Sequence, residues 1–387
     1  MVSLPLVRRT RALMEGPLIL GGGPAGAAAA IRLGHAGARP VVIERQRSIG
    51  DALCGGFVSW RTIAAIEALG VEADLLNPSL ITHVRIFANG KSAEARLPAA
   101  ARAVSRHRLD TLLLEAATRA GAGVELGTGV RAIDEAGVRL ADSATLRPDT
   151  VFLATGKHDL RGAARPASAR GRDPTLGIRV RVLPTPSLRR ILGGRIELHC
   201  FAGGYAGIVL QEDGSANICM AVHQSRFDRS GNPRRLLQDL GIALPAFGAR
   251  LETLDDAAAI DAIANVPYGW RAPETTSGCY RLGDQAAVIP SLAGEGIGIA
   301  IASAASAVAH WQRHGRGGAI DYQTSFAKAA GPPLRNAGLL RTLAEHRIGG
   351  SVLVKAMRYL PTLAKGAARL TRIDTIPIDA RASTPHI

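Results

Sequence analysis

Glycines at positions 21, 23 and 26 have the spacing G-x-G-x-x-G, whose chemistry is the binding of a pyrophosphate. Gly21 would allow a tight turn, Gly23 a close approach of backbone to phosphate, and Gly26 close packing of a helix on a strand. Pro24 and Ala25 lie in the same turn, before a helix whose N-terminal N–H groups and dipole would face the phosphates. The segment predicts a phosphate-binding turn.

A strand is predicted before this turn, and a helix and a second strand are predicted after it. The apolar run at residues 17–20 predicts a buried strand, residues 27–36 predict a buried helix, and residues 41–43 predict a second strand that ends on Glu44. An acid roughly 20 residues after the glycines accepts hydrogen bonds from ribose hydroxyls. Its charge repels a 2′-phosphate, which disfavours NADP. The unit therefore predicts a dinucleotide site.

A thiol follows this unit in a glycine-flanked loop, Asp51 to Gly56, which contains Cys54 and Gly55. The chain has four cysteines, far apart and without a C-x-x-C pair. Neither a zinc site nor a disulfide framework is indicated, and we expect no metal.

Length and composition exclude several classes of protein. With 387 residues, 47% of them apolar and 20% charged, the chain can hold two or three folding units. The net charge is +15, but aromatic residues are only 4% and no basic-aromatic platform occurs, so we expect no nucleic-acid partner. The start, residues 1–15, reads as a basic leader without a cleavage site, and no run of about 18 apolar residues occurs. We expect a cytoplasmic protein, either free or peripheral at a membrane surface.

The rest of the chain alternates helical and strand patterns. Asn89-Gly90 predicts a hairpin turn, and residues 137–156 predict a β-meander whose last strand is 150–153. Alternating residues turning at Asp213-Gly214 predict an antiparallel sheet. Further expected elements are helices at 58–69 and 109–120, a strand containing Val130, a strand at 279–282, a small-residue helix starting at 294–298, and helices after 313.

Four motifs occur in an order that is typical of one flavoprotein group: GGGPAG with Glu44, the Arg-x-x-Leu-Asp run from Arg106, ATG at 154–156, and RLGDQAAVIPSLAGEGIGIA at 281–300. Over roughly residues 16–315 the chain resembles the single-Rossmann FAD proteins, which include p-hydroxybenzoate hydroxylase-type monooxygenases and geranylgeranyl reductases.

The resemblance implies FAD as the cofactor. Asp284 would bond its ribityl chain, Arg106 would lie against its phosphates, and the backbone of Val130 would contact the adenine. The glycine-rich helix start would lie near the flavin pyrimidine. The other implied FAD residues are Gly156, Gly283, Gly294, Gly296 and Ile297.

The Cys-Gly-Gly loop and the sequence Gly-Glu-Gly-Ile at 294–297 resemble the geranylgeranyl reductases, which would place Cys54 beside the flavin ring. The thiol would either protonate a carbon that has received hydride or shape the pocket. Gly55 and Tyr205 are the implied substrate-pocket residues. Tyr205 matches the first residue of the Tyr-x-Trp-x-Phe-Pro motif of those reductases, but the tryptophan position is Gly207. The substrate is therefore not identified by this motif.

We predict an α/β fold with three parts. A Rossmann-type FAD-binding domain, with a parallel sheet and a β-meander, would comprise residues 16–165 and 275–315. An antiparallel-sheet substrate domain would be inserted at 166–274, and a basic helical segment would follow at 316–387.

The predicted function is that of an FAD-dependent oxidoreductase acting on a hydrophobic small molecule, by hydride transfer from reduced flavin to a carbon–carbon double bond. The alternative is hydroxylation, in which reduced flavin captures oxygen. An alternative of another class is a non-catalytic redox sensor. Because one nucleotide fingerprint occurs, the electrons would come from an external donor, NAD(P)H or a redox protein.

Residues 333–372 carry eight basic residues against a single acid, Glu345, with apolar residues at helical spacing. Gly349-Gly350 and Pro361 are expected to divide this segment into short helices. Basic amphipathic helices lie at anionic membrane surfaces. The alternative is that these helices pack on the FAD domain with a solvated basic face.

Overall fold

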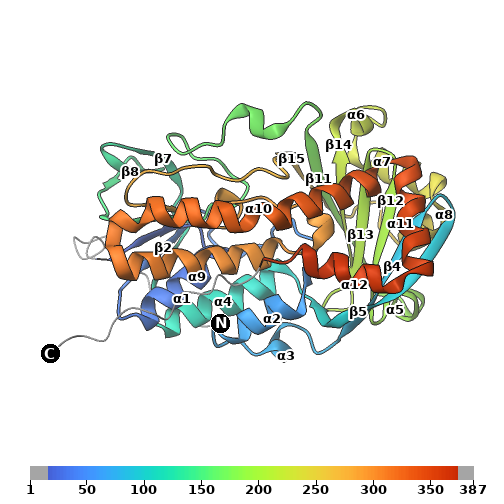
Figure 1. The fold of residues 1–387 in the computed structure, drawn as a ribbon, viewed down its shortest axis with the longest axis horizontal. Coiled ribbons are helices and arrows are strands. Elements are labelled where there is room, and N and C mark those ends of the chain that lie inside the picture. The colour runs from blue at the N-terminus through green and yellow to red at the C-terminus, as the bar shows by residue number, and fades with distance from the viewer. Residues whose placement is uncertain (1–15, 374–387) are drawn as a thin grey trace.

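The computed structural model describes residues 16–373, so the basic leader and residues 374–387 of the predicted C-terminal segment lie outside the described residues. One end of the molecule contains a five-stranded, all-parallel sheet in the order β16-β10-β1-β2-β6 (Figure 1). This confirms the Rossmann-type sheet. Its strands are β1 (Leu18–Leu20), β2 (Val41–Glu44), β6 (Gly123–Leu126), β10 (Val151–Leu153) and β16 (Cys279–Arg281).

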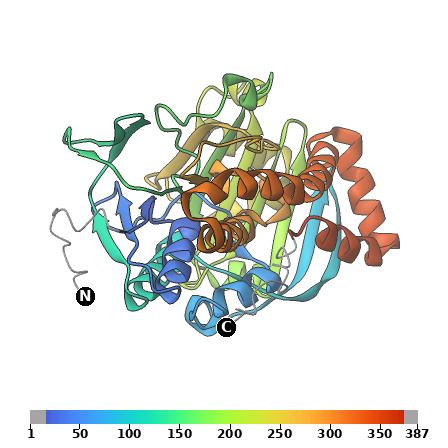
Figure 2. The same ribbon diagram turned by 60° about the vertical axis from the view of Figure 1, so that its left-hand side comes forward.

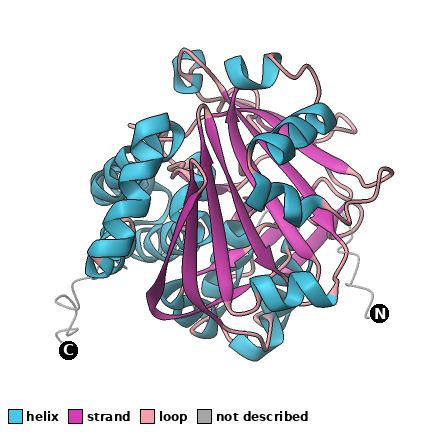
Figure 3. Cartoon of the chain, turned by 90° about the vertical axis from the view of Figure 1, so that its right-hand side faces the viewer, coloured by secondary structure: helices cyan, strands magenta, loops and turns pink. Residues whose placement is uncertain are grey.

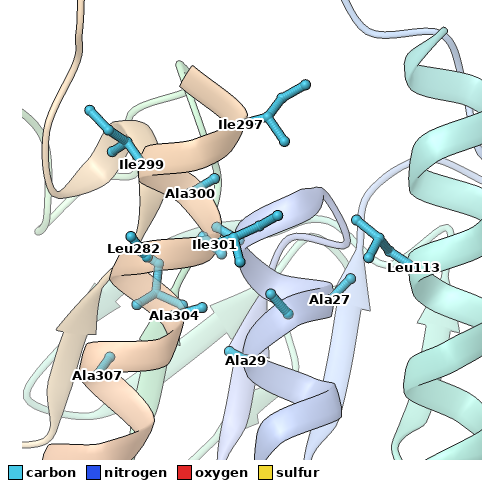
Figure 4. Packing of buried hydrophobic residues seen from close by; sticks show 14 of the residues in the cluster. Ala27, Ala29, Leu113, Leu282, Ile297, Ile299, Ala300, Ile301, Ala304 and Ala307 are labelled. Carbon is cyan, nitrogen blue, oxygen red and sulfur yellow. The ribbon is translucent and has the colours of Figure 1, made fainter. Parts of the chain in front are cut away.

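Three helices cover one face of this sheet: α1 (Pro24–His35), α4 (Arg106–Arg119) and α9 (Gly296–His314). Alanines such as Ala29 and Ala304 line the contact between α1 and α9, and their small side chains let the two helices approach closely (Figure 4). The helix α1 begins three residues before the predicted start because Pro24 occupies its first turn, where proline needs no N–H partner. The glycine turn is thus fixed between a buried strand and a buried helix.

A three-stranded antiparallel meander packs on the other face, through contacts such as Val138 and Leu140 with Leu18 and Leu20. It consists of β7 (Val130–Asp134), β8 (Gly137–Leu140) and β9 (Thr145–Leu146). The last two lie within the predicted meander, and β7 is the strand predicted separately at Val130. The assignment of residues 150–153 to the meander was wrong, because β10 pairs with β1 and β16. All three of its side chains are buried, as expected in the middle of a parallel sheet.

The second sheet has eight strands in the order β15-β11-β14-β13-β12-β4-β5-β3 (Figure 3). Asn89 and Gly90, both with positive φ, form the predicted hairpin turn between β4 and β5. The parallel pairing of β12 with β4 joins two distant parts of the chain, and the other pairings are antiparallel. The strands are β3 (Phe57–Val58), β4 (Ile81–Ala88), β5 (Lys91–Ala103), β11 (Thr175–Val182), β12 (Arg195–Phe201), β13 (Gly204–Leu210), β14 (Ala216–His223) and β15 (Ile260–Val266).

Residues 57–103 therefore contribute strands to this sheet, although the predicted boundaries place them in the FAD-binding domain. Shorter elements complete both parts, and the predicted helix at 58–69 is α2, which begins after its cap Ser59. The shorter helices are α2 (Trp60–Glu67), α3 (Ala73–Leu76), α5 (Pro186–Leu192), α6 (Gln224–Asp228), α7 (Pro233–Ala243) and α8 (Pro245–Leu251), with single turns η2 (Ala167–Arg170), η3 (Gly283–Gln285), η4 (Ser291–Ala293) and η5 (Gly315–Gly317).

The C-terminal helices are α10 (Gly318–Glu345), α11 (Arg347–Tyr359) and α12 (Pro361–Leu370). The first spans both parts of the molecule, and the other two lie against β4 and β5 (Figure 2). The predicted break at Pro361 is confirmed. None of the described helices combines the length and the apolar composition needed to cross a bilayer.

The predicted break at Gly349-Gly350 was wrong, because both glycines lie inside α11 and the chain turns at His346, whose backbone is extended. A Cβ on Gly349 would lie 2.4 Å from the Leu343 carbonyl oxygen, and one on Gly350 would lie 3.0 Å from Cβ of Ala88. These glycines therefore allow close packing of α11 on α10 and β4.

Candidate functional site

A cavity of about 1110 Å³ lies between the two sheets. Its walls come from the glycine turn, the Cys54 loop, the eight-stranded sheet, the start of α9 and the inner sides of α11 and α12. Of the predicted site residues, Gly26 is buried beneath the turn, and the others all line this cavity: Gly21, Gly23, Pro24, Ala25, Glu44, Cys54, Gly55, Arg106, Val130, Gly156, Tyr205, Gly283, Asp284, Gly294, Gly296 and Ile297.

The glycine turn has the shape that a pyrophosphate requires. Gly21 has φ +108°, and a Cβ there would lie 2.4 Å from the Ala154 carbonyl oxygen. A Cβ on Gly26 would lie 1.9 Å from the Gly21 carbonyl oxygen. Above the turn, Nη2 of Arg106 lies 3.1 Å from the position of a Cβ on Gly23. The turn is therefore a cradle that side chains would fill, with a cation beside it, and this fits the phosphates of a dinucleotide.

Glu44 lies at the end of β2 and caps the turn. One carboxylate oxygen accepts a hydrogen bond from the Gly22 N–H at 2.9 Å, and the other accepts from the Gln46 N–H at 3.0 Å. Each oxygen retains a lone pair, because a carboxylate offers about four acceptor positions. The geometry leaves Glu44 able to accept from ribose hydroxyls, with Val130 of β7 on the same cavity wall.

Arg106 is held in place by its neighbour one helical turn away. Its Nε and Nη2 donate to the two carboxylate oxygens of Asp110 at 2.9 and 2.7 Å. Burial disfavours the charge of the guanidinium, but Asp110 outweighs it and the pKa of Arg106 is raised. The arginine is therefore a fixed cation. Asp110, which orients it, belongs to the Arg-x-x-Leu-Asp motif but was not among the predicted site residues.

The ATG turn and the Gly-Asp motif meet in the cavity. The Gly156 carbonyl accepts from Gln285 at 2.9 Å, and the Gly283 N–H donates to Ser303 at 2.8 Å. Asp284 pairs with Lys157, whose Nζ lies 3.0 Å from its carboxylate. Asp284 raises the pKa of Lys157 above its ordinary value, against the effect of burial.

Sequence reasoning did not select Lys157, although it directly follows the ATG turn. Any ribityl hydroxyl that binds Asp284 shares that carboxylate with this ammonium group.

The start of α9 faces the same cavity. Gly294 has φ +64°, and a Cβ there would lie 2.7 Å from the ring of Phe57. Gly296 opens the helix, and Ile297 is buried beside it. A helix N-terminus directed at the cavity stabilises negative charge there. The Glu295 side chain accepts hydrogen bonds from Ser59 and Thr62.

The Cys54 loop is fastened to the second sheet. The Asn217 amide of β14 donates to the carbonyl oxygens of Cys54 and Gly55, both at 3.0 Å. The thiol itself accepts from the Gly56 N–H at 3.4 Å. Cys219, two residues after Asn217 on the same strand, also lines the cavity, and its burial raises the pKa to about 12. The structure thus adds a second thiol that the spacing of the cysteines did not indicate.

Comparison with known proteins decides which dinucleotide this turn serves. Residues 17–151 match the model of the FAD-binding domain family. FAD is therefore the cofactor, and the cradle at Gly21 to Gly26 with Arg106 is consistent with its pyrophosphate.

Other similarities extend beyond the FAD-binding domain. A menaquinone reductase of Mycolicibacterium smegmatis is 30% identical over 167 residues, which cover 41% of this chain and 38% of that protein. Pseudomonas aeruginosa PqsL, solved with 2-aminobenzoylacetate, has a TM-score of 0.68 and 20% identity over 87% of this chain and 99% of its own. A geranylgeranyl bacteriochlorophyll reductase-like protein of Thermoplasma acidophilum has a TM-score of 0.63 and 19% identity over 92% of this chain and 98% of its own. Over about nine-tenths of its length the chain thus has the fold of these two solved structures.

Proposed function

We propose that this protein is an FAD-dependent oxidoreductase that reduces a carbon–carbon double bond in a hydrophobic small molecule. The observation that carries the proposal is that the FAD-binding turn, the Cys54 thiol and an apolar wall all line one cavity. The similarity to a protein named a menaquinone reductase favours reduction.

The apolar wall supports a hydrophobic substrate. It is made by the inner surfaces of the second sheet and of α11: Ile86, Ile196, Leu198, Val209, Leu353 and Met357. Burial of apolar surface here would contribute about 25 cal/mol for each Å² removed from water. A substrate would therefore place its apolar part against the sheet and its reacting carbon toward the glycine-rich end of the cavity.

Bound FAD in its reduced form supplies the hydride. The residues of the protein orient the cofactor and the substrate and supply the proton. Arg106 and the glycine turn would hold the phosphates, and Asp284 with Lys157 would hold the ribityl chain. The Cys54 thiol lies at the cavity wall, and Asn217 fixes the backbone that carries it. This thiol would deliver the proton that completes reduction of the double bond.

Replacing Cys54 with serine is expected to leave FAD content unchanged and to slow single-turnover reduction of an unsaturated acceptor by about 100-fold, because a general acid contributes 10²- to 10⁴-fold. The rate is measured by mixing pre-reduced protein with acceptor in the absence of oxygen. Cys279→Ser is the matched control, since Cys279 lies on β16 outside the cavity lining. Equal rates for Cys54→Ser and the control would reduce Cys54 to a pocket-shaping residue.

Hydroxylation is the second candidate, because PqsL, which is described as a probable FAD-dependent monooxygenase, has the same fold. The two reactions separate when reduced protein meets oxygen: a hydroxylase inserts an atom of ¹⁸O from labelled oxygen into the product, whereas a reductase adds only hydrogen. In both cases we propose an external donor, NAD(P)H or a redox protein, as the source of electrons.

We further propose peripheral contact with an anionic membrane, at the cytoplasmic face. Ile348 and Val352 on α11 are 70% and 49% exposed, and Tyr359 on the same helical face is 73% exposed. Basic side chains such as Lys355 and Arg358 are exposed among them. The opposite side of α11 lines the cavity, so a docked helix pair would separate the substrate site from the lipid by one layer.

The Lys355→Glu/Arg358→Glu variant is therefore expected to lose most of its binding to vesicles that contain anionic phospholipid, since each basic residue contributes about 1 kcal/mol near such a surface. Co-sedimentation at low and high salt measures this. The control is Arg172→Glu/Arg229→Glu, which changes the same charge at exposed residues of the 171–229 region. If both variants bound the vesicles equally, or if the unmodified protein did not bind them, membrane contact would be excluded. The basic residues of α11 would then form only a solvated face.

A further inference from the structure

Three hydroxyl groups from three parts of the chain meet at one side of the cavity. Tyr205 lies on β13, Tyr268 follows β15, and Ser291 opens the turn η4 that precedes α9. The Ser291 hydroxyl lies 2.7 Å from the Tyr205 oxygen and accepts from the Tyr268 hydroxyl at 2.9 Å. Tyr205 also accepts from the Leu292 N–H at 2.9 Å. We call Tyr205, Ser291 and Tyr268 the hydroxyl triad.

The hydroxyl triad has one hydroxyl proton more than it has acceptors among the described residues. Its three hydroxyls carry three protons, and the two hydrogen bonds between them use two. No other described residue accepts a hydrogen bond from the triad, so one hydroxyl proton is left, on either Ser291 or Tyr205. Burial, reinforced by Tyr268, raises the pKa of Tyr205 well above its ordinary value, and burial also raises the pKa of Tyr268. Both phenols therefore remain donors at neutral pH.

The surroundings of the hydroxyl triad are apolar, which makes the remaining donor distinctive. All three members line the cavity, beside Val209, Val266 and the Leu292 side chain. Arg341 stacks on the Tyr268 ring, with Cζ 4.9 Å from the ring centroid, and pairs with Glu345 at 2.6 Å. Ser291 is exposed and lines the cavity, so water can pair with the remaining donor in the free protein. A substrate that displaces this water must offer an acceptor at the same point, because a donor left unpaired against an apolar ligand is costly.

We propose that the hydroxyl triad binds a carbonyl oxygen of the substrate, so that the substrate class is an apolar α,β-unsaturated carbonyl compound. This proposal rests on the proposed function, because the bound carbonyl must lie near the flavin. Ser291 lies five residues before Gly296, where α9 begins at the FAD end of the cavity. A hydrogen bond to a carbonyl withdraws electron density from a conjugated double bond. The same bond that fixes the orientation of the substrate would thus also activate it.

Ligand binding to the FAD-loaded protein tests the proposal without turnover. The probes are 2-acetylnaphthalene, which has a carbonyl, and 2-isopropylnaphthalene, which has a similar shape without one. Calorimetry gives the ratio of their affinities, and the infrared stretch of ¹³C-labelled carbonyl reports its hydrogen bond. We expect the unmodified protein to prefer the ketone and to shift its carbonyl stretch to lower frequency than in hydrocarbon solvent.

Because any single substitution leaves another hydroxyl proton free, the decisive variant is Tyr205→Phe/Tyr268→Phe/Ser291→Ala. The ketone preference should fall roughly five- to tenfold, with hydrocarbon affinity retained and the carbonyl shift abolished. The control Ser325→Ala/Tyr359→Phe removes two hydroxyls from residues outside the cavity lining and should bind as the unmodified protein does. Unchanged ketone preference in the triple variant, or equal loss of both probes, would overturn the proposal. A protein that discriminates the probes but reduces no unsaturated acceptor would instead refute the proposed function and leave the triad intact.

Discussion

Replacing Gly26 with alanine is expected to yield a protein that contains almost no FAD and unfolds at a lower temperature. Gly26 lies in the first turn of α1, and a Cβ there would lie 1.9 Å from the Gly21 carbonyl oxygen. Both partners of this clash are backbone, so the helix must move away from the turn that cradles the phosphates. Overpacking of this kind costs about 1–3 kcal/mol or more, and the displaced N–H groups no longer converge on the cofactor.

The ratio of flavin to protein absorbance and the unfolding temperature measure the two effects separately. Gly338→Ala is the matched control, because Gly338 is also helical and nothing lies within 4 Å of its Cβ position. That variant should keep its FAD and gain slightly in stability, since alanine favours a helix interior by about 0.5–1 kcal/mol.

A second variant covers the case in which Gly26→Ala does not fold. In Gly23→Ala the new Cβ meets only Nη2 of Arg106, at 3.1 Å, and a shift of a few tenths of an ångström relieves this contact. This protein should fold and bind FAD more weakly. Full FAD content in both glycine variants would show that the turn does not hold the cofactor.

Features encoded within a few residues were predictable from the sequence. The strand–turn–helix around Gly21 needs only apolar runs and glycine spacing, and the hairpin needs only Asn89-Gly90, whose positive φ values suit that turn. The FAD-site residues form such local motifs as well. Their convergence on one cavity depends on the parallel sheet, which brings the ends of β1, β2, β10 and β16 to the same edge.

Features that depend on pairing between distant segments were not predictable. The parallel pairing of β4 with β12 places His83 opposite Arg195, more than a hundred residues away, and no periodicity indicates it. The contact of Lys157 with Asp284 and the meeting of Tyr268 with Ser291 are of the same kind. At Gly349-Gly350 the expectation that glycine ends a helix was wrong. Glycine can end a helix or let another element approach closely, and the position of β4 decides between the two.

The buried pair of Glu295 and Arg372 also joins distant segments, and it ties the C-terminal helices to the FAD end of the cavity. Nε of Arg372 lies 2.8 Å from the Glu295 carboxylate, with side chains 4% and 2% exposed. The same guanidinium donates to the Ala293 carbonyl at 2.6 Å and stacks on Trp60 at 5.2 Å. Arg372 therefore holds the loop that leads into α9.

Removing this arginine is expected to destabilise the protein by about 3–5 kcal/mol, because the Glu295 carboxylate would remain buried without its cation. Burial raises the pKa of Glu295 above the unfolded value of 4.5, and Arg372 partly offsets that rise. In Arg372→Ala the folded pKa rises further. Between pH 4.5 and the folded pKa the folded state then holds a proton that the unfolded state has released, so the free energy of unfolding falls as pH rises through this range.

Denaturant unfolding at pH 5 and pH 7.5 measures the effect, which should be larger at pH 7.5. Arg369→Ala is the matched control, since Arg369 is exposed on α12 and its loss should change stability by less than about 0.5 kcal/mol at either pH. Adding Glu295→Gln to Arg372→Ala should remove the pH dependence and recover part of the stability, because an amide can stay buried between Ser59 and Thr62 without charge. If Arg372→Ala matched Arg369→Ala at both pH values, the pair would contribute nothing to folding, and the tie between α12 and the FAD end of the cavity would have to rest on apolar packing alone.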